Sequence, residues 1–192
     1  MSLKVGVLGS TRGTALQGIL DAVAAGTLDV EIVLVVSDKQ SAPILERAAN
    51  HGVRVLFLDP AGLKRDIYDQ QVSNALREAG AELVLMVGYM RIVSAEFVEA
   101  WRGRLLNVHP SLLPAFGGLM NMQVHEAVLA AGVSETGCTI HQVTEEVDGG
   151  PIVLQKHCPV LPGDTAEILK NRVQALEQAA FIEVLHGWRA LW

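Results

Sequence analysis

The sequence predicts an α/β protein: a doubly wound, mostly parallel and twisted sheet with helices on both faces, giving three layers. Two observations predict this fold. Short apolar segments alternate with segments of helical periodicity along the first half of the 192 residues, as strand–helix–strand units do. The apolar segments are nearly continuous in hydrophobic residues, which is typical of parallel strands that are buried on both faces.

The first half of the chain therefore divides into five strands and the helices between them. The expected strands cover 3–8, 30–36, 53–57, 83–87 and 105–108, and the expected helices cover about 14–25, 43–50, 65–79 and 95–101. Each strand segment is short and apolar, and many are rich in β-branched residues, which favour strands. The helical segments are long enough to connect parallel neighbours in one sheet.

The pattern loosens after Pro110, where a loop rich in Gly and Pro runs to about Leu119. A helix is expected over about 123–131, followed by strands over 138–143 and 152–157. The last helix is expected to begin in Asp164–Glu167, which resembles a capping box. Its apolar stripe at helical spacing consists of Leu169, Val173, Leu176, Ala180 and Val184.

Composition limits the class of protein. The 15 Lys and Arg against 21 Asp and Glu give a net charge of −6, which disfavours long contacts with nucleic acid. The two cysteines, Cys138 and Cys158, offer no disulfide framework and indicate a reducing compartment. No apolar run approaches the roughly 20 residues of a membrane span, and no leader precedes the first strand. We therefore expect a soluble cytoplasmic protein without membrane contacts.

Three polar residues form the main candidate for chemistry. Asn107 and His109 lie two apart on a strand, so their side chains share a face, and Pro110 ends the strand beside them. Asn107 offers an N–H donor for a developing oxyanion, and His109 exchanges protons near neutral pH. Asp148 precedes a Gly-Gly turn, which suits a carboxylate presented from a loop. We expect these three groups to converge on one reacting carbonyl.

The glycine-rich turn after the first strand is a candidate phosphate site. It leads from Gly9 to Thr14 and into a helix, whose first N–H groups favour anions. Neither the P-loop nor the dinucleotide pattern matches, although Asp38 lies where a ribose-binding acid often sits. A monophosphate held by Gly13, Thr14 and the N–H of Ala15 is favoured over a dinucleotide, and a plain turn without a ligand remains an alternative.

Taken together, these features resemble the glycinamide ribonucleotide formyltransferase family of folate-dependent enzymes. The resemblance covers nearly the whole chain. It is carried by the following segments: Gly13–Thr14, Gly88–Ile92, Leu106–Pro114, Gly137–His141, Glu146–Pro151 and Arg172–Glu177. The run Asn-Val-His-Pro-Ser-Leu-Leu-Pro with a later Asp-Gly-Gly-Pro is specific for the wider formyltransferase superfamily, and the phosphate turn with Glu177 narrows it to the ribonucleotide branch.

The resemblance implies a role for each matching position. The catalytic residues would be Asn107, His109 and Asp148, and the substrate-phosphate turn would be Arg12, Gly13, Thr14 and Ala15. Glu177 would bind the ribose hydroxyls of the substrate. The folate pocket would be lined by Met90, Arg91, Ile92, Val93, Asn107, Val143, Thr144, Glu145, Glu146, Val147 and Asp148. In a single domain over 1–192, residues 1–104 would form the nucleotide half, and residues 105–192 would form the catalytic and folate half.

The implied reaction moves a formyl group from 10-formyltetrahydrofolate to the amine of glycinamide ribonucleotide, a step of purine synthesis. The amine would attack directly, Asn107 and protonated His109 would stabilise the oxyanion, and Asp148 would raise the pKa of His109. The resemblance implies small-molecule substrates and no metal, and the protein would be a monomer or a homodimer. Ala15 departs from the family's Asn or Asp, which leaves only a backbone N–H at that position.

Other interpretations remain open. A formyltransferase acting on initiator methionyl-tRNA and a formyl-tetrahydrofolate hydrolase share the three polar residues but normally carry further domains. A flavodoxin-like mononucleotide-binding module explains the turn and the sheet without any chemistry. Without the resemblance, Glu177 would be interpreted as a residue at the edge of an apolar helix face, and Arg91 as a surface arginine. His125 and His141 would be interpreted as hydrogen-bonded core residues.

Overall fold

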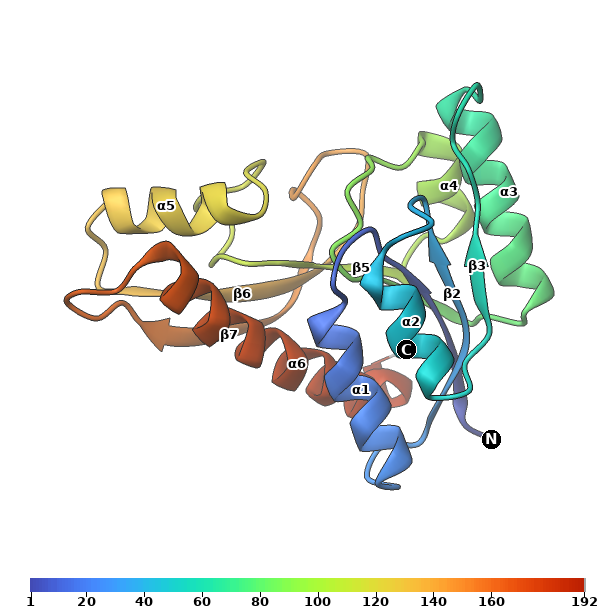
Figure 1. Cartoon of the computed structure of the whole chain (residues 1–192), viewed down its shortest axis with the longest axis horizontal. Helices are drawn as coiled ribbons and strands as arrows, with labels where there is room; N and C mark the ends of the chain where they lie inside the picture. Colours follow the sequence, from blue (N-terminus) through green and yellow to red (C-terminus); the bar gives the residue numbers. More distant parts are fainter. Residues whose placement is uncertain (192) are drawn as a thin grey trace.

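The computed structural model describes residues 1–191, with side chains described as far as Trp188. It is an α/β protein, as predicted (Figure 1). The strands are β1 (Leu3–Leu8), β2 (Val30–Ser37), β3 (Val55–Phe57), β4 (Leu83–Met86), β5 (Leu105–His109), β6 (Glu135–Gln142) and β7 (Ile152–Pro159). The helices are α1 (Thr14–Ala24), α2 (Pro43–Asn50), α3 (Arg65–Glu78), α4 (Ala95–Ala100), α5 (Met122–Ala130) and α6 (Ala166–Leu191).

One sheet holds all of these strands, in the order β3-β2-β1-β4-β5-β6-β7. The pairs from β3 to β5 are parallel, whereas β5 pairs antiparallel with β6 and β6 pairs antiparallel with β7. The strand order reverses between β1 and β4, because β2 and β3 extend the sheet on one side of β1 and the later strands extend it on the other side. In open α/β sheets, a crevice forms at such a reversal, beyond the carboxyl ends of the strands.

Two hydrophobic clusters lie on opposite faces of the sheet. One joins α1, α2 and α6 to the sheet through residues such as Leu16, Ile44 and Val173. The other joins α3 and α4 to it through Tyr68, Phe97 and neighbours. The apolar strands supply both clusters alternately, which explains why the strands read as continuous hydrophobic runs in the sequence.

Two strands begin at residues other than those predicted, and several strand ends differ by one or two residues. β3 begins at Val55 and not at 53, because the N–H of Val53 donates to the carbonyl of Ala48 and closes the end of α2. β6 begins at Glu135 and not at 138, because it pairs with β7 along its whole length, from Glu135 opposite Pro159. The polar start of β6 carries no hydrophobic signal, so only its partner strand reveals it.

The long helix α6 has the predicted apolar stripe, and Leu169, Val173 and Ala180 are buried. Its cap differs from the prediction. Thr165 Oγ1 accepts the N–H of Ile168 at 3.3 Å, whereas Asp164 accepts from the Arg172 guanidinium at 2.6 and 2.9 Å. Within residues 1–191, no helix is both long and apolar enough to cross a membrane.

Candidate functional site

A cleft of about 370 Å³ lies at the reversal of strand order. Its walls come from the turn between β1 and α1, the segment after β4, the end of β5, the loop after β6 and one face of α6. These segments are far apart in the sequence and meet because the carboxyl ends of parallel strands share one edge of the sheet. The sheet topology therefore places this cleft, and the loops determine its chemistry.

Every residue predicted for the site lines this cleft. They are Arg12, Gly13, Thr14, Ala15, Met90, Arg91, Ile92, Val93, Asn107, His109, Val143, Thr144, Glu145, Glu146, Val147, Asp148 and Glu177. The predicted phosphate turn, polar trio and folate wall thus share one cavity. The role of each residue stays a prediction at this point.

The turn before α1 has the geometry of an anion site. Gly13 has φ 65°, a left-handed conformation that favours glycine, and it caps α1. A Cβ on Gly13 would lie 2.4 Å from the side chain of Ile44 on α2. Thr14 and Ala15 open the helix, so their N–H groups have no intrahelical acceptor. The side chain of Ala15 is buried and apolar, which leaves only its backbone N–H to contact a ligand.

The three predicted polar residues converge, and a fourth joins them. His109 Nδ1 lies 3.3 Å from a carboxylate oxygen of Asp148, and His109 Nε2 lies 3.1 Å from the carbonyl oxygen of Phe116. His141 Nε2 lies 3.6 Å from the other oxygen of Asp148 and 3.1 Å from Asn107 Nδ2. Asp148 therefore lies between two imidazole rings, and Asn107 contacts the second ring.

The position of Asp148 is fixed by its loop. Its φ is 55°, and one carboxylate oxygen accepts the N–H of Gly118 at 2.9 Å. Two residues later, Gly150 packs so tightly that a Cβ there would lie 1.8 Å from the carbonyl oxygen of Gln142. The Gly-Gly pair after Asp148 thus permits its backbone to approach that of Gln142 closely. This approach places the Asp148 carboxylate beside His109 on β5.

The pKa of His109 reflects two opposing effects. Burial lowers the pKa of His109 below its ordinary value, and this outweighs the opposing effect of the Asp148 carboxylate. The Asp148 carboxylate does act to raise the pKa of His109, as predicted, but burial opposes it more strongly and the net shift is downward. Burial also tends to raise the pKa of Asp148, but hydrogen bonds from His141 and the Gly118 N–H prevail and lower it. The resting pair is thus a carboxylate beside a neutral imidazole.

Glu177 lies on the α6 wall of the same cleft. Burial raises its pKa to about 8, and within the described residues its carboxyl group has no hydrogen bond or ion pair. Lys170, Gln174 and Glu177 follow one another at spacings of four and three residues, so they lie on one face of α6. A desolvated carboxyl group without a partner suits a ligand that donates hydroxyl hydrogen bonds.

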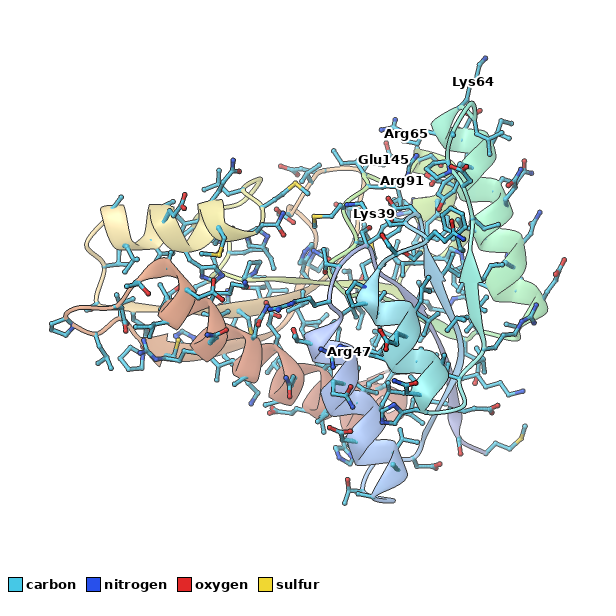
Figure 2. The ribbon with its side chains drawn as sticks, viewed as in Figure 1. Lys39, Arg47, Lys64, Arg65, Arg91 and Glu145 are labelled. Carbon is cyan, nitrogen blue, oxygen red and sulfur yellow. The ribbon has the colours of Figure 1, made fainter. Side chains whose placement is uncertain are left out.

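Arg91, labelled in Figure 2, lies in the segment after β4 and lines the cleft. Its guanidinium carbon is 4.6 Å from the centre of the Tyr68 ring, and its Nε is buried without a hydrogen-bond partner among the described side chains. The buried carboxylate of Asp69 on α3 accepts the N–H of Ser94 at 2.6 Å, and this bond ties the end of the same segment to α3. Arg91 is therefore a stacked and supported cation in the cleft wall.

Asp38, the candidate dinucleotide acid, has a different contact. Its carboxylate accepts the hydroxyl of Ser10 at 2.6 Å, and Ser10 Oγ accepts the N–H of Met90 at 2.9 Å. This chain of bonds joins the ends of β1, β2 and β4. Asp38 does not line the cleft, so the geometry favours the monophosphate interpretation of the turn.

The sequence analysis gave no site role to several polar residues that line the cleft, among them His125, His141, Lys170 and Gln174. His141 and His125 are buried, as expected of core residues. His141 contacts Asn107 and Asp148, whereas Nδ1 of His125 has no hydrogen-bond partner among the described residues. The register of β5 with β6, which places Asn107 opposite His141, carries this information, and no local motif shows it. The spacing of Lys170 and Gln174 from Glu177 was an available signal.

Other groups conform to structural roles. Cys138 is buried, and burial raises its pKa to about 12, so it is a poor nucleophile. Among the described residues, no group of three or more His, Cys, Asp or Glu side chains is arranged to hold a metal ion.

Known proteins similar to this chain include formyltransferases of purine biosynthesis. The chain is 37% identical over 189 residues to a phosphoribosylglycinamide formyltransferase of Escherichia coli, with 98% of this chain and 87% of that protein covered. It is 43% identical over 185 residues to the trifunctional purine biosynthetic protein adenosine-3 of Drosophila pseudoobscura pseudoobscura. That alignment covers 95% of this chain and 13% of the trifunctional protein, so the chain spans a small part of it.

Solved structures show the same similarity in three dimensions. A glycinamide ribonucleotide transformylase of Symbiobacterium toebii has a TM-score of 0.91 at 43% identity, with 96% of this chain and 86% of that chain covered. A phosphoribosylglycinamide formyltransferase of Coxiella burnetii has a TM-score of 0.93 at 36% identity, with 99% and 88% covered. The formyl transferase family model matches residues 3–185. With a match over almost its entire length, the chain belongs to the formyl transferase family.

Proposed function

We propose that this protein transfers the formyl group of 10-formyltetrahydrofolate to the amine of 5′-phosphoribosylglycinamide, a step of purine biosynthesis. The observation that carries this proposal is the shared cleft, in which the polar cluster of Asn107, His109 and Asp148 lies in one cavity with the turn before α1 and Glu177. Relatives named for this reaction support it. The phosphate would bind the N–H groups of Gly13, Thr14 and Ala15, and Glu177 would bind the ribose hydroxyls.

The proposed mechanism begins with direct attack of the substrate amine on the formyl carbon. The new C–N bond gives a tetrahedral carbon with a negative oxygen, which Asn107 Nδ2 and the His109 ring stabilise by donating hydrogen bonds. Asp148 would accept the proton that the attacking nitrogen loses, and that same proton would pass through the neighbouring His109 ring to the departing N10 of the folate as the old C–N bond breaks. The proton balance closes without a covalent enzyme intermediate.

The environment of His109 fits this sequence of events. One ring nitrogen faces the Phe116 carbonyl and the other faces Asp148. Burial favours the neutral ring. When Asp148 passes on the proton of the attacking nitrogen, the ring would gain its charge as the negative oxygen forms, and its Nε2–H would then donate to that oxygen in place of the Phe116 carbonyl.

We further propose that formyl-folate is a co-substrate that binds against Met90, Arg91, Ile92, Val93 and residues 143–148, and that no resident metal takes part. On this proposal, residues 1–104 serve the ribonucleotide and residues 105–192 serve catalysis and folate. The protein would act in the cytoplasm on small molecules, as a monomer or a homodimer, without nucleic acid or membrane partners.

The deciding experiment mixes the protein with glycinamide ribonucleotide and 10-formyltetrahydrofolate and follows the absorbance of the folate. Turnover that depends on the ribonucleotide is expected. Formyl loss without the ribonucleotide would favour a hydrolase, and absence of turnover would favour a binding module.

A variant tests the assigned chemistry. His109→Ala should lower kcat by about 10²–10³ at saturating substrates, because an oxyanion donor is lost. Near-normal turnover in this variant, with folding confirmed by circular dichroism, would contradict the role of His109.

A further inference from the structure

The turn before α1 is held from its outer side by α2. The N–H of Ile44 donates to the carbonyl of Thr11 at 3.1 Å, and Arg47 Nε donates to the carbonyl of Arg12 at 2.6 Å. The side chain of Ile44 also fills the space beside Gly13. Two consecutive carbonyl groups of the turn are thereby drawn toward α2.

Fixing these carbonyl groups also fixes the N–H groups that follow them. In a planar trans peptide, the C=O and N–H bonds point in opposite directions, and the peptide units after Thr11 and Arg12 are trans. When both carbonyl oxygens face α2, the N–H groups of Arg12 and Gly13 face away from α2. Arg12 and Gly13 line the cleft, whereas Arg47 does not. Arg47 therefore orients the N–H groups on the cleft side of the turn through a contact on the opposite side of the turn.

A second contact fixes the guanidinium itself. Arg47 Nη1 donates to Gln17 Oε1 on α1 at 2.9 Å, so one planar group spans the turn and the helix that follows it. Figure 2 shows Arg47 between α1 and α2. A guanidinium has several donors in a rigid fork, whereas an ammonium is a single compact charge. Only arginine can hold the Arg12 carbonyl and Gln17 together in this geometry.

We propose that Arg47 is a positioning residue for the substrate phosphate: it orients the turn at Arg12 and Gly13 without touching the ligand. Its charge also lies beside the first turn of α1, where it complements an anion. The inference rests on the proposed function in taking the anion to be the phosphate of the ribonucleotide. It predicts that Arg47 affects phosphate affinity and leaves formyl transfer and folate binding unchanged.

The test compares Arg47→Met with the wild type in steady-state kinetics and in calorimetric binding of ribose 5-phosphate. Loss of a charge-assisted bond is expected to raise the KM for the ribonucleotide about tenfold or more. The affinity for ribose 5-phosphate should fall by a similar factor. The kcat and the KM for formyl-folate should stay within about twofold, because the cluster around His109 lies on other elements. The exposed Arg77→Met on α3 is the matched control and should change neither quantity.

Two further variants separate the possible causes. Arg47→Lys keeps a charge but not the fork, so it should recover only part of the affinity; full recovery would assign the effect to charge and overturn the positioning role. Gln17→Leu removes one contact of the fork and should raise the same KM by a smaller factor, which keeps the test valid if Arg47→Met folds poorly. An unchanged KM in both Arg47→Met and Gln17→Leu overturns the inference.

The binding measurement is independent of catalysis. If the wild type does not formylate the ribonucleotide, the proposed function fails. Weaker binding of ribose 5-phosphate to Arg47→Met would still support the role of Arg47. If the wild type is active and Arg47→Met binds ribose 5-phosphate normally, the inference fails and the proposed function stands.

Discussion

The ring of His109 shows how burial and charge compete at a single residue. Its exposed fraction is 4%, and loss of hydration disfavours the imidazolium more than the nearby carboxylate favours it. We expect the pKa of His109 in the free protein to lie below its ordinary value of about 6.5. Asp148→Asn should lower this pKa further, because the carboxylate charge that favours the imidazolium is removed. The NMR chemical shift of ¹³C-labelled histidine, assigned with His109→Gln, measures both values. A pKa above 7 in the free wild type would contradict this balance.

Glu177 carries a prediction about stability and pH. The folded protein keeps the proton of Glu177 up to about pH 8, whereas an unfolded chain releases it near pH 4.3. Between these values the unfolded state binds fewer protons, so the free energy of unfolding falls as the pH rises. Glu177→Gln removes this penalty and should raise Tm by a few degrees at pH 8.5, with a smaller gain near pH 5.

The exposed Glu78→Gln on α3 serves as the control for that comparison and should show no such dependence on pH. An equal or lower Tm for Glu177→Gln at pH 8.5 would show that the buried carboxyl group is not destabilising. In kinetics, the same variant should raise the KM for the ribonucleotide more than the KM for formyl-folate.

At this scale, the sequence predicts residues whose neighbours along the chain restrict them. Asn107 and His109 share a strand face and precede a proline, and Asp148 precedes two glycines. His141 was interpreted as a core residue because its partners belong to other elements, and its contact with Asn107 depends on the pairing of β5 with β6. The upward effect of Asp148 on the pKa of His109 follows from the sequence, whereas the larger downward effect of burial does not, because the depth of burial depends on the tertiary fold.

At the scale of elements, the hairpin of β6 and β7 determines where Asp148 lies. Gly150→Ala would place a methyl group 1.8 Å from the backbone oxygen of Gln142, so the hairpin has to open and Asp148 has to move. We expect kcat to fall by more than tenfold, since misplacing a reacting group by about 1 Å can cost about 10²-fold. We also expect a lower Tm.

Gly117→Ala is the matched change near the same carboxylate. Its methyl group would meet Leu113 and Asp148 at ordinary contact distances of 3.5 and 3.8 Å, and activity should remain close to that of the wild type. Equal kinetics for the two alanine variants would show that the tight approach at Gly150 does not position Asp148.

The elements themselves follow from the sequence where hydrophobic periodicity is strong, as in β1, β4 and α6. The polar beginning of β6 was missed because its residues join the sheet through backbone bonds to β7, and backbone bonding leaves no mark in side-chain hydropathy. Helix α6 begins within the predicted segment Asp164–Glu167, but Arg172 engages the Asp164 carboxylate, and Thr165 accepts the N–H at the start of the helix. Whether a short polar segment forms the local structure that its sequence predicts thus depends on its partners in the tertiary structure.

On the scale of the whole molecule, the cleft gathers residues from β1 to α6, so a bound ligand joins elements that are distant in the sequence. A ligand that binds only the folded state stabilises it by about 2.7 kcal/mol at a hundredfold excess over Kd. For a chain of this size, Tm should rise by roughly 5–10 °C with the ribonucleotide. Differential scanning calorimetry measures this shift, and the nucleoside without its phosphate should give a clearly smaller one. Equal shifts for both compounds would argue against a phosphate site at the turn.

Helix α6 packs against α1, α5, β6 and β7, and it carries Glu177 in the cleft wall. One helix thus borders the cleft and backs strands β6 and β7, whose connecting loop carries Asp148. An inhibitor that binds behind this helix, outside the cleft, would displace both the cleft wall and the strands that carry the Asp148 loop. Its inhibition would not be competitive with either substrate, and resistance mutations would occur along the back of the helix, far from the reacting atoms.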